Sequence, residues 1–266
     1  MVETWLIVLG LLNLILLIIG LTVILPWRWW TEVRGFSQDI FRVHLPMIAL
    51  IVAIVVIHLV EVRYIDSVAT AIVGQDFTPV FQSIEDGAVR WLVQHWYPPL
   101  VTVCVYIYIG IYPFTLWFTP LFFLLTNNTR AMKTFAVSLL FVYAVALPFY
   151  LFFPVTNVYT YFHEPSALNT VLPNVEHFFY STTTTNNCFP SLHVAMALLV
   201  FLSVLITKNK RYIALTAFSA GGVIFSVLYL GIHWITDVIG GAVLAIGIFY
   251  LVTRFIRGPY ARQTHD

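Results

Sequence analysis

The sequence predicts an all-α integral membrane protein with about seven transmembrane helices. Of the 266 residues, 60% are hydrophobic and only 9% are charged, and the mean hydropathy is +0.90. A soluble globular domain carries roughly 25% charged residues. The composition therefore excludes an ordinary soluble enzyme and a disordered chain. It also excludes a nucleic-acid-binding protein, which needs a basic surface.

Seven apolar runs are long enough to cross a bilayer, which takes about 20 residues of helix. They cover residues 5–26, 43–62, 100–125, 132–153, 190–207, 212–230 and 235–256. The first run lacks the basic segment and the A-x-A site of a signal peptide, so we interpret it as a retained span. The third run contains Pro113 and Pro120, where we expect a kink.

The distribution of basic residues predicts the orientation in the membrane. Eleven of the 13 Lys and Arg residues fall in one set of connections or beside it, and only Arg63 and Arg90 fall in the other. Because positive residues concentrate in cytoplasmic connections, the N-terminus is expected outside and the C-terminus in the cytoplasm. Residues 63–99 and 154–189 then form the external segments. The eleven residues are Arg28, Arg34, Arg42, Arg130, Lys133, Lys208, Lys210, Arg211, Arg254, Arg257 and Arg262.

A first polar group opens the fifth span. Residues 189–193 read FPSLH and follow a polar run of threonines and asparagines. Pro190 suits the first turn of a helix, where its missing N–H costs nothing. The amides after it would then be free to bind an anion at the helix N-terminus, together with the Ser191 hydroxyl and the His193 ring.

A second polar group, residues 226–237, joins the sixth span to the seventh. His233 and Asp237 are four residues apart and share one helical face. A carboxylate bonded to one ring nitrogen fixes the tautomer and leaves the other nitrogen free to attack. The hairpin of the fifth and sixth spans returns His233 to the same face as His193. Together the two groups indicate phosphoryl transfer through a phosphohistidine.

Other interpretations of these residues remain open from the sequence. Two histidines and an aspartate can ligate zinc, although H-x-x-x-D is a loose pattern. A transporter or a non-catalytic lipid-binding protein is the alternative function; transport predicts polar residues near the centre of several spans, and those stretches are almost wholly apolar here. We expect His44, His58 and His95 to be polar residues near the interface without a catalytic role.

On these residues the chain resembles the type 2 phosphatidic acid phosphatase (PAP2) superfamily of membrane lipid phosphatases and phosphotransferases. The P-S-x-H signature of that family is matched by residues 190–193. Its S-R-x5-H-x3-D signature is matched at Ser226, His233 and Asp237. The resemblance covers roughly residues 100–256 and implies a PAP2-type helical bundle.

Three departures separate the chain from the family's usual pattern. The K-x6-R-P signature is absent from the outer side, Val227 replaces the Arg of the third signature, and Leu192 replaces the usual Gly of the second. FPSLH without that Arg is similar to the inositol phosphorylceramide synthase branch, which transfers phosphoinositol between lipids.

The resemblance implies a role for each matching residue. His233 is the expected nucleophile, oriented by Asp237, and His193 is the expected acid that protonates the leaving oxygen. Ser191 and Ser226 are expected to hold phosphate oxygens. Hydrolysis and transfer differ only in the second acceptor, which is water or an alcohol.

The positive charge that a transferring phosphoryl group needs has no obvious source. Among the external Lys and Arg residues, we expect Arg90 to bind phosphate, with His163 and His177 as further candidates. No metal and no cofactor is expected, because a covalent phosphohistidine divides the reaction into two displacements.

The chain is accordingly divided into N-terminal spans with an external interfacial segment (1–99), a PAP2-like catalytic bundle (100–256) and a cytoplasmic tail (257–266). The expected partners are a lipid phosphate substrate and the surrounding membrane lipids, and no nucleic acid. The expected location is the plasma membrane with the site facing outside, or an internal membrane with the site facing the lumen.

Overall fold

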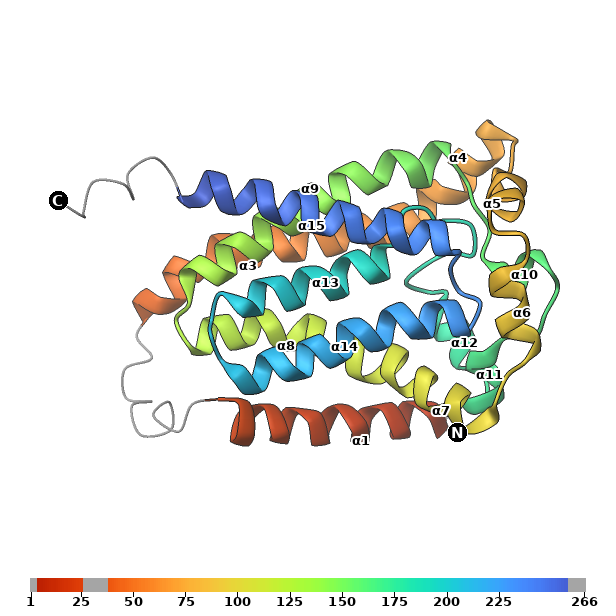
Figure 1. Ribbon diagram of the computed structural model, residues 1–266. Coiled ribbons are helices and arrows are strands. Elements are labelled where there is room, and N and C mark those ends of the chain that lie inside the picture. Colours follow the sequence, from red (N-terminus) through yellow and green to blue (C-terminus); the bar gives the residue numbers. More distant parts are fainter. Residues whose placement is uncertain (1–3, 26–37, 258–266) are drawn as a thin grey trace.

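The computed structural model describes residues 4–25 and 38–257, and these ranges are mainly helical (Figure 1). Within them, the β-structure is limited to an isolated bridge between Val155 and Asn187. Six helices are long and apolar enough to cross a membrane, which confirms a helical membrane protein. These helices are Thr4–Ile24, Ile40–Val73, Pro98–Leu125, Thr129–Phe152, Lys210–Tyr229 and Ile235–Ile256.

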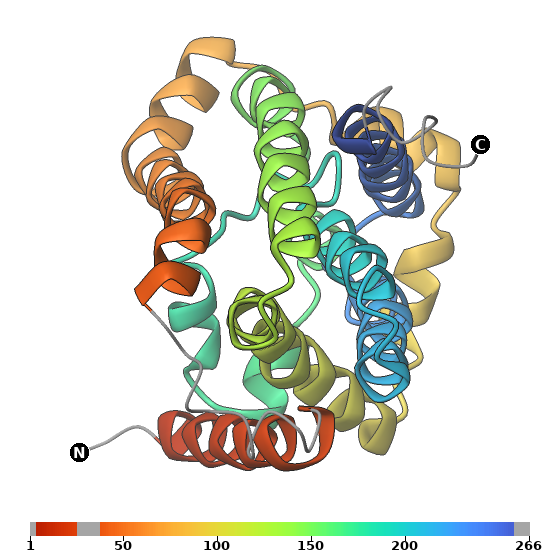
Figure 2. The same ribbon diagram turned by 90° about the vertical axis from the view of Figure 1, so that its left-hand side faces the viewer.

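The expected fifth span is shorter than the others. Residues 190–207 contain α13 (Leu192–Leu205), which has 14 residues and is about 21 Å long at a rise of about 1.5 Å per residue. It packs against the neighbouring helices of the bundle, and Figure 2, which looks along the bundle, shows it beside α9, α14 and α15. Six of the seven expected spans therefore coincide with a helix of spanning length, and the count of seven stays a prediction.

Three of the long helices contain a π-helical turn. One of these turns directly precedes Pro113, which lacks the N–H that would bond to the carbonyl four residues earlier. The π-helical turn η4 thus lies next to Pro113, where a kink was expected, and Pro120 lies inside α8. The three helices with a π-helical turn are α1 (Thr4–Ile19) with η1 (Gly20–Ile24), α3 (Gln38–Val60) with η3 (Glu61–Ile65) and α4 (Asp66–Val73), and α7 (Pro98–Tyr106) with η4 (Ile107–Ile111) and α8 (Tyr112–Leu125).

The remaining long helices have no such interruption, and the short helices gather at one end of the bundle (Figure 1). The beginning of α1 lies at that end, and the end of α15 lies at the other. Both segments predicted to lie outside therefore share one end. The long helices are α9 (Thr129–Phe152), α14 (Lys210–Tyr229) and α15 (Ile235–Arg257), and the short ones are α5 (Thr78–Glu85), α6 (Ala88–Gln94), α10 (Val158–Tyr161), α11 (Ala167–Val171) and α12 (Val175–Phe179).

The basic residues that predict the orientation are distributed as expected over the described helices. Arg42, Arg130 and Lys210 lie near helix starts at the end opposite the short helices, and Arg63 and Arg90 lie on elements at the short-helix end. The orientation in a membrane stays a prediction. Arg28, Arg34, Arg262 and most of the expected tail 257–266 lie outside the described residues.

Glycines allow α15 to approach the start of α13 closely. A Cβ atom on Gly241 would lie 2.3 Å from the carbonyl oxygen of Ser191. A Cβ on Gly240 would lie 2.7 Å from the ring of Phe189. The amide of Ser191 donates to the carbonyl of Asp237 at 3.0 Å across the same contact. The packing of α15 on α13 therefore fixes the two segments that carry the predicted site.

We expect Gly241→Ala to destabilise the protein, because the new methyl group meets a backbone carbonyl that cannot move without shifting α13. Overpacking of this kind costs about 1–3 kcal/mol. Gly247→Ala is the matched control on the same helix, since a Cβ there meets no atom within 4 Å. Thermal unfolding in detergent compares the two variants, and equal unfolding temperatures would contradict the close approach.

Candidate active site

A tight turn between α14 and α15 positions His233. The backbone amide of His233 donates to the carbonyl of Val227 at 3.0 Å. Gly231 in this turn has a φ of +70°, and a Cβ there would lie 2.6 Å from the side chain of Val93. Glycine is required because other residues are strained at positive φ. The turn therefore presents His233 immediately before α15 with a fixed backbone.

The buried side chains of Asp237 and His233 and the partly buried side chain of His193 form a hydrogen-bonded row. Nδ1 of His233 lies 3.3 Å from Oδ2 of Asp237, and Nε2 of His233 lies 3.1 Å from Nδ1 of His193. A carboxylate can only accept, so Nδ1 of His233 carries the proton and donates. Nε2 then has the lone pair and accepts from the His193 ring. The topology predicted that the two histidines meet, and the structure confirms it.

The carboxylate of Asp237 is itself held in place. Its Oδ2 accepts the backbone amide of Trp234 at 2.9 Å. In this arrangement the side chain of the third helical residue bonds to the backbone amide of the residue just before the helix. Glu85 from α5 caps the same terminus, because its Oε1 accepts the amide of Thr236 at 2.7 Å. Negative groups at a helix N-terminus are stabilised by the helix dipole. The N-terminus of α15 thus fixes the Asp237 carboxylate, and this carboxylate in turn orients the His233 ring.

Burial lowers the pKa of His233 below the usual value of a histidine. The imidazole is 3% exposed, and removal from water disfavours its charged form. The ring is therefore neutral at pH 7, which is the form that can attack phosphorus. His193 is enclosed by aromatic rings: the centroid of Phe179 is 5.9 Å away and those of Tyr108 and Tyr112 are 5.1 and 6.0 Å away.

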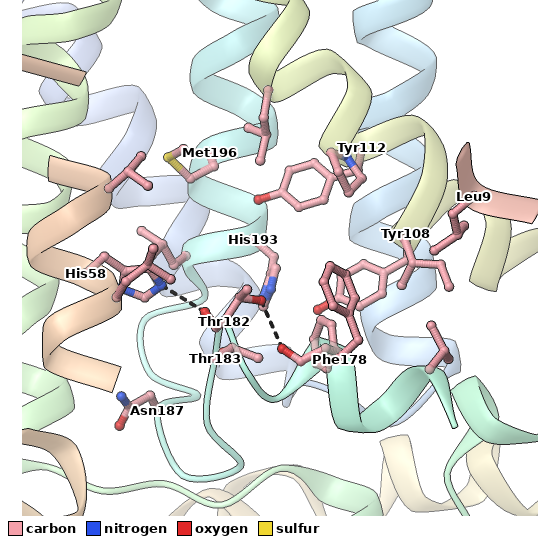
Figure 3. A pocket seen from close by; sticks show the side chains of 18 of the residues that line it. Leu9, His58, Tyr108, Tyr112, Phe178, Thr182, Thr183, Asn187, His193 and Met196 are labelled. Atoms are coloured by element: carbon pink, nitrogen blue, oxygen red, sulfur yellow. Dashed lines mark hydrogen bonds between the residues drawn. The ribbon is translucent and has the colours of Figure 1, made fainter. Parts of the chain in front are cut away.

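An apolar cavity of about 450 Å³ leads to His193 (Figure 3). Its wall comes from α1, α3, η4, α8, α9, α12, α13 and the loop before α13, with residues such as Leu9, Val55, Tyr112 and Met196. The volume is within the range of ordinary ligand pockets. An apolar chain attached to a phosphate group fits the chemistry of such a wall.

A small polar pocket of about 10 Å³ lies beside both histidines. Burial raises the pKa of Tyr180, so its phenol keeps a proton that it can donate. The sequence marked Thr183, Thr184 and Asn187 only as part of the polar run before FPSLH, and it did not predict that this run contacts the site. The polar lining consists of Asn157, Tyr180, Thr183, Thr184, Asn187 and Cys188.

The closed geometry limits how a substrate enters. A pocket of about 10 Å³ has room for roughly one water molecule, and the 3.1 Å contact between His193 and His233 leaves no room for phosphorus between them. A phosphate group therefore has to separate the two rings or displace the loop above them.

Ser191 does not form the expected anion site. The helix begins at Leu192, after Pro190, and Ser191 is its N-cap, with Oγ accepting the amide of Val194 at 3.3 Å. The Ser191 amide, expected to be free, donates to the carbonyl of Asp237. Ser191 is fully buried. Its observed contacts position α13 against α15.

The structure places Ser226 and Arg90 away from both cavities. Ser226 is fully buried on α14 beside Cys104. Arg90 lies 3.8 Å from Glu164 and its guanidinium stands 4.4 Å from the ring centroid of Phe162, so its charge is used on the outer surface of α6. At the position of the family's signature Arg, Val227 is fully buried in the core.

Three of the other histidines are exposed at the surface, and one lines the apolar cavity. His163 and His177 are exposed and line neither cavity described above. His95 is exposed and stacks on Trp91, as expected for an interfacial residue. His58 lines the apolar cavity, a position that the sequence did not predict. Nothing in its local sequence marked it.

Cys188, His233 and Asp237 form the one group of potential metal ligands found among the described residues, with ligand atoms within 4.8 Å of one another. The thiol of Cys188 donates to the carbonyls of Thr185 and Ile232 at 3.7 Å. Burial raises the pKa of Cys188, which favours the neutral thiol over the thiolate that binds metals. Cys188 is bonded to backbone carbonyls and present as a thiol, and His233 is bonded to Asp237, so the group fits a metal poorly.

Comparison with known proteins identifies the family. Residues 80–251 match the family model of the PAP2 superfamily, which is well over half of the chain, and the protein belongs to that superfamily. The match contains His193, His233 and Asp237. Searches of curated proteins and of solved structures found no match. The chain is thus an integral membrane protein of the PAP2 superfamily.

We expect Asp237→Asn to lower the rate of phosphoryl transfer by about 10²- to 10⁴-fold, as in other sites that lose the orienting carboxylate. Asn can still accept the Trp234 amide, so the fold should persist, but it no longer stabilises the protonated His233 ring. Steady-state rates and unfolding temperatures check this. The exposed Asp86→Asn is the control, and a wild-type rate in Asp237→Asn would remove the orienting role.

The low pKa of His233 predicts that the rate of phosphoenzyme formation does not fall between pH 7 and pH 5 through loss of the nucleophile. Because the folded ring stays neutral below the usual histidine pKa of about 6.5, formation of the phosphoenzyme should keep its nucleophile as the pH falls from 7 towards 5. The groups that face His233 are His193, Asp237 and Cys188. Rapid-quench measurement of the phosphoenzyme tests this, and an acid limb centred near 6.5 or above would contradict it.

Proposed function

We propose that the protein is a lipid phosphatase or phospho-head-group transferase that works through a phosphohistidine at His233. The observation that carries this proposal is the row of Asp237, His233 and His193 at the end of an apolar cavity. Membership of the PAP2 superfamily supports a phosphatase- or phosphotransferase-type activity. The proposed substrate is a lipid phosphate ester or phosphodiester.

In the first displacement, Nε2 of His233 attacks phosphorus while Nδ1–H donates to Asp237. The phosphorus–oxygen bond to the leaving group breaks, and its electron pair goes to that oxygen. His193, as an imidazolium, gives the leaving oxygen a proton and becomes neutral. The tautomer deduced from the row matches the role of His233, because its Nε2 already holds the lone pair.

In the second displacement, His193 removes a proton from water or from an alcohol. The oxygen attacks phosphorus, the phosphorus–nitrogen bond breaks, and its electron pair returns to His233. The acceptor alone decides between hydrolysis and transfer. The enclosure of His193 by Phe179, Tyr108 and Tyr112 limits access of water, which supports transfer to an alcohol.

We further propose that the enzyme belongs to the inositol phosphorylceramide synthase branch and acts at the outer or lumenal leaflet. The FPSLH motif and Val227 in place of Arg support the branch. The predicted orientation, with the short helices and the site outside, supports the leaflet. Ser191 and Ser226 enter this proposal as residues that position α13 and α14.

Replacement of His233 tests the function directly. Release of phosphate from a panel of lipid phosphates and pyrophosphates, and transfer to inositol-like or glycerol acceptors, would be measured in detergent without added metal. We expect His233→Ala to abolish both, because the covalent step has no other nucleophile, and the ratio of release to transfer to identify the branch.

The control is His95→Ala, an exposed histidine on the same outer end, which should turn over like wild type. Activity that survives His233→Ala would disprove the phosphohistidine. A folded wild-type protein that turns over no substrate would instead support a non-catalytic lipid-binding protein or a transporter built on this fold.

A further inference from the structure

A second histidine–carboxylate pair lines the same apolar cavity as His193. His58 lies on α3, and its Nδ1 is 3.5 Å from Oε2 of Glu61. Its Nε2 is 3.1 Å from the carbonyl oxygen of Thr182 (Figure 3). The side chain of Glu61 is 2% exposed, whereas that of His58 is 24% exposed. The carboxylate is thus buried behind the ring, and the ring faces the cavity.

The contacts of the His58 ring favour a positive charge on it. Nε2 bonds to the Thr182 carbonyl, and Nδ1 makes an ion-pair contact with Glu61 at 3.5 Å without a hydrogen bond. A protonated ring presents an N–H to both oxygens, whereas a neutral ring turns a lone pair towards one of them. Asp66, a second buried carboxyl, lies beside Glu61.

This charge lies where the site needs one. Among the described residues, the basic side chains that line the two cavities are His58, His193 and His233, and neither lining contains Lys or Arg. Asn187 lines both cavities and donates to Oε1 of Glu61 at 3.2 Å, which connects the pair to the polar pocket. His58 is also near enough to His193 for the charges of the two rings to repel each other.

We infer that His58, held as an imidazolium by Glu61, supplies the positive charge that binds the phosphate group of the substrate. It takes the part of the Lys and Arg residues that the PAP2 signatures contain and this chain lacks. On binding, the ring exchanges its contact with the Thr182 carbonyl for a phosphate oxygen and keeps its ion-pair contact with Glu61. The inference rests on the proposed function and makes His58 a binding residue, with proton transfer left to His193.

Two substitutions separate charge from structural anchoring. His58→Gln keeps an N–H donor for the Thr182 carbonyl but carries no charge, and His58→Lys keeps both a donor and a charge. Charge-assisted hydrogen bonds are strong enough that His58→Gln should raise KM at least about tenfold, with a smaller change in kcat. His58→Lys should restore KM to near the wild-type value, and His95→Gln is the control. Equal KM values for the Gln and Lys variants would overturn the inference.

A binding measurement gives a second readout that needs no turnover. Inorganic phosphate should raise the unfolding temperature of the wild type and of His58→Lys, and should not raise that of His58→Gln. If His58→Gln does not fold, Glu61→Gln removes the counter-ion instead, and it should likewise raise KM and lose protection by phosphate. Full protection in a variant without the His58 charge would overturn the inference.

The two proposals fail in different ways. Turnover that depends on His233 but is unchanged in His58→Gln leaves the proposed function intact and removes the role of His58. Absence of turnover in the wild type removes the proposed function. Protection by phosphate that requires the charge at position 58 would then still establish the anion site.

Discussion

The amide of Ser191 donates to the carbonyl of Asp237 at 3.0 Å, which joins the beginning of α13 to the beginning of α15. Gly241 permits this distance, because any side chain there would collide with the Ser191 carbonyl. His193 follows two residues after Ser191, so one backbone contact sets the spacing between the acid and the carboxylate. The 3.1 Å contact between the two histidine rings depends on it.

A scarcity of charge distinguishes this site. Val227 occupies the core position where the family signature has Arg, and Arg90 is held at the surface by Glu164. The groups left at the reactive end are neutral donors and histidines. In a buried environment of low dielectric constant, even one imidazolium and a few oriented dipoles interact strongly with a phosphate group. His58 lines the apolar cavity, and Tyr180 lines the small polar pocket beside the two histidines.

The N-terminal helices complete the cavity. Leu9 on α1 and Val55 and His58 on α3 form part of its wall, although residues 1–79 lie outside the match to the PAP2 superfamily. The superfamily region thus supplies the reactive histidines, and the preceding helices supply apolar surface and the imidazolium.

The sequence by itself determined the membrane class, most of the long helices and the meeting of His193 with His233. Hydrophobic run length, helical spacing and hairpin connectivity are local properties, and they suffice for these conclusions. Tertiary structure alone decided that the Ser191 amide bonds to the Asp237 carbonyl, that Arg90 pairs with Glu164 and that His58 lines the cavity. Those outcomes depend on partners far apart in the chain: His58 meets Thr182 across 124 positions, and Asn187 meets Glu61 across 126. No local pattern encodes such a pairing, because the packing of whole helices creates it.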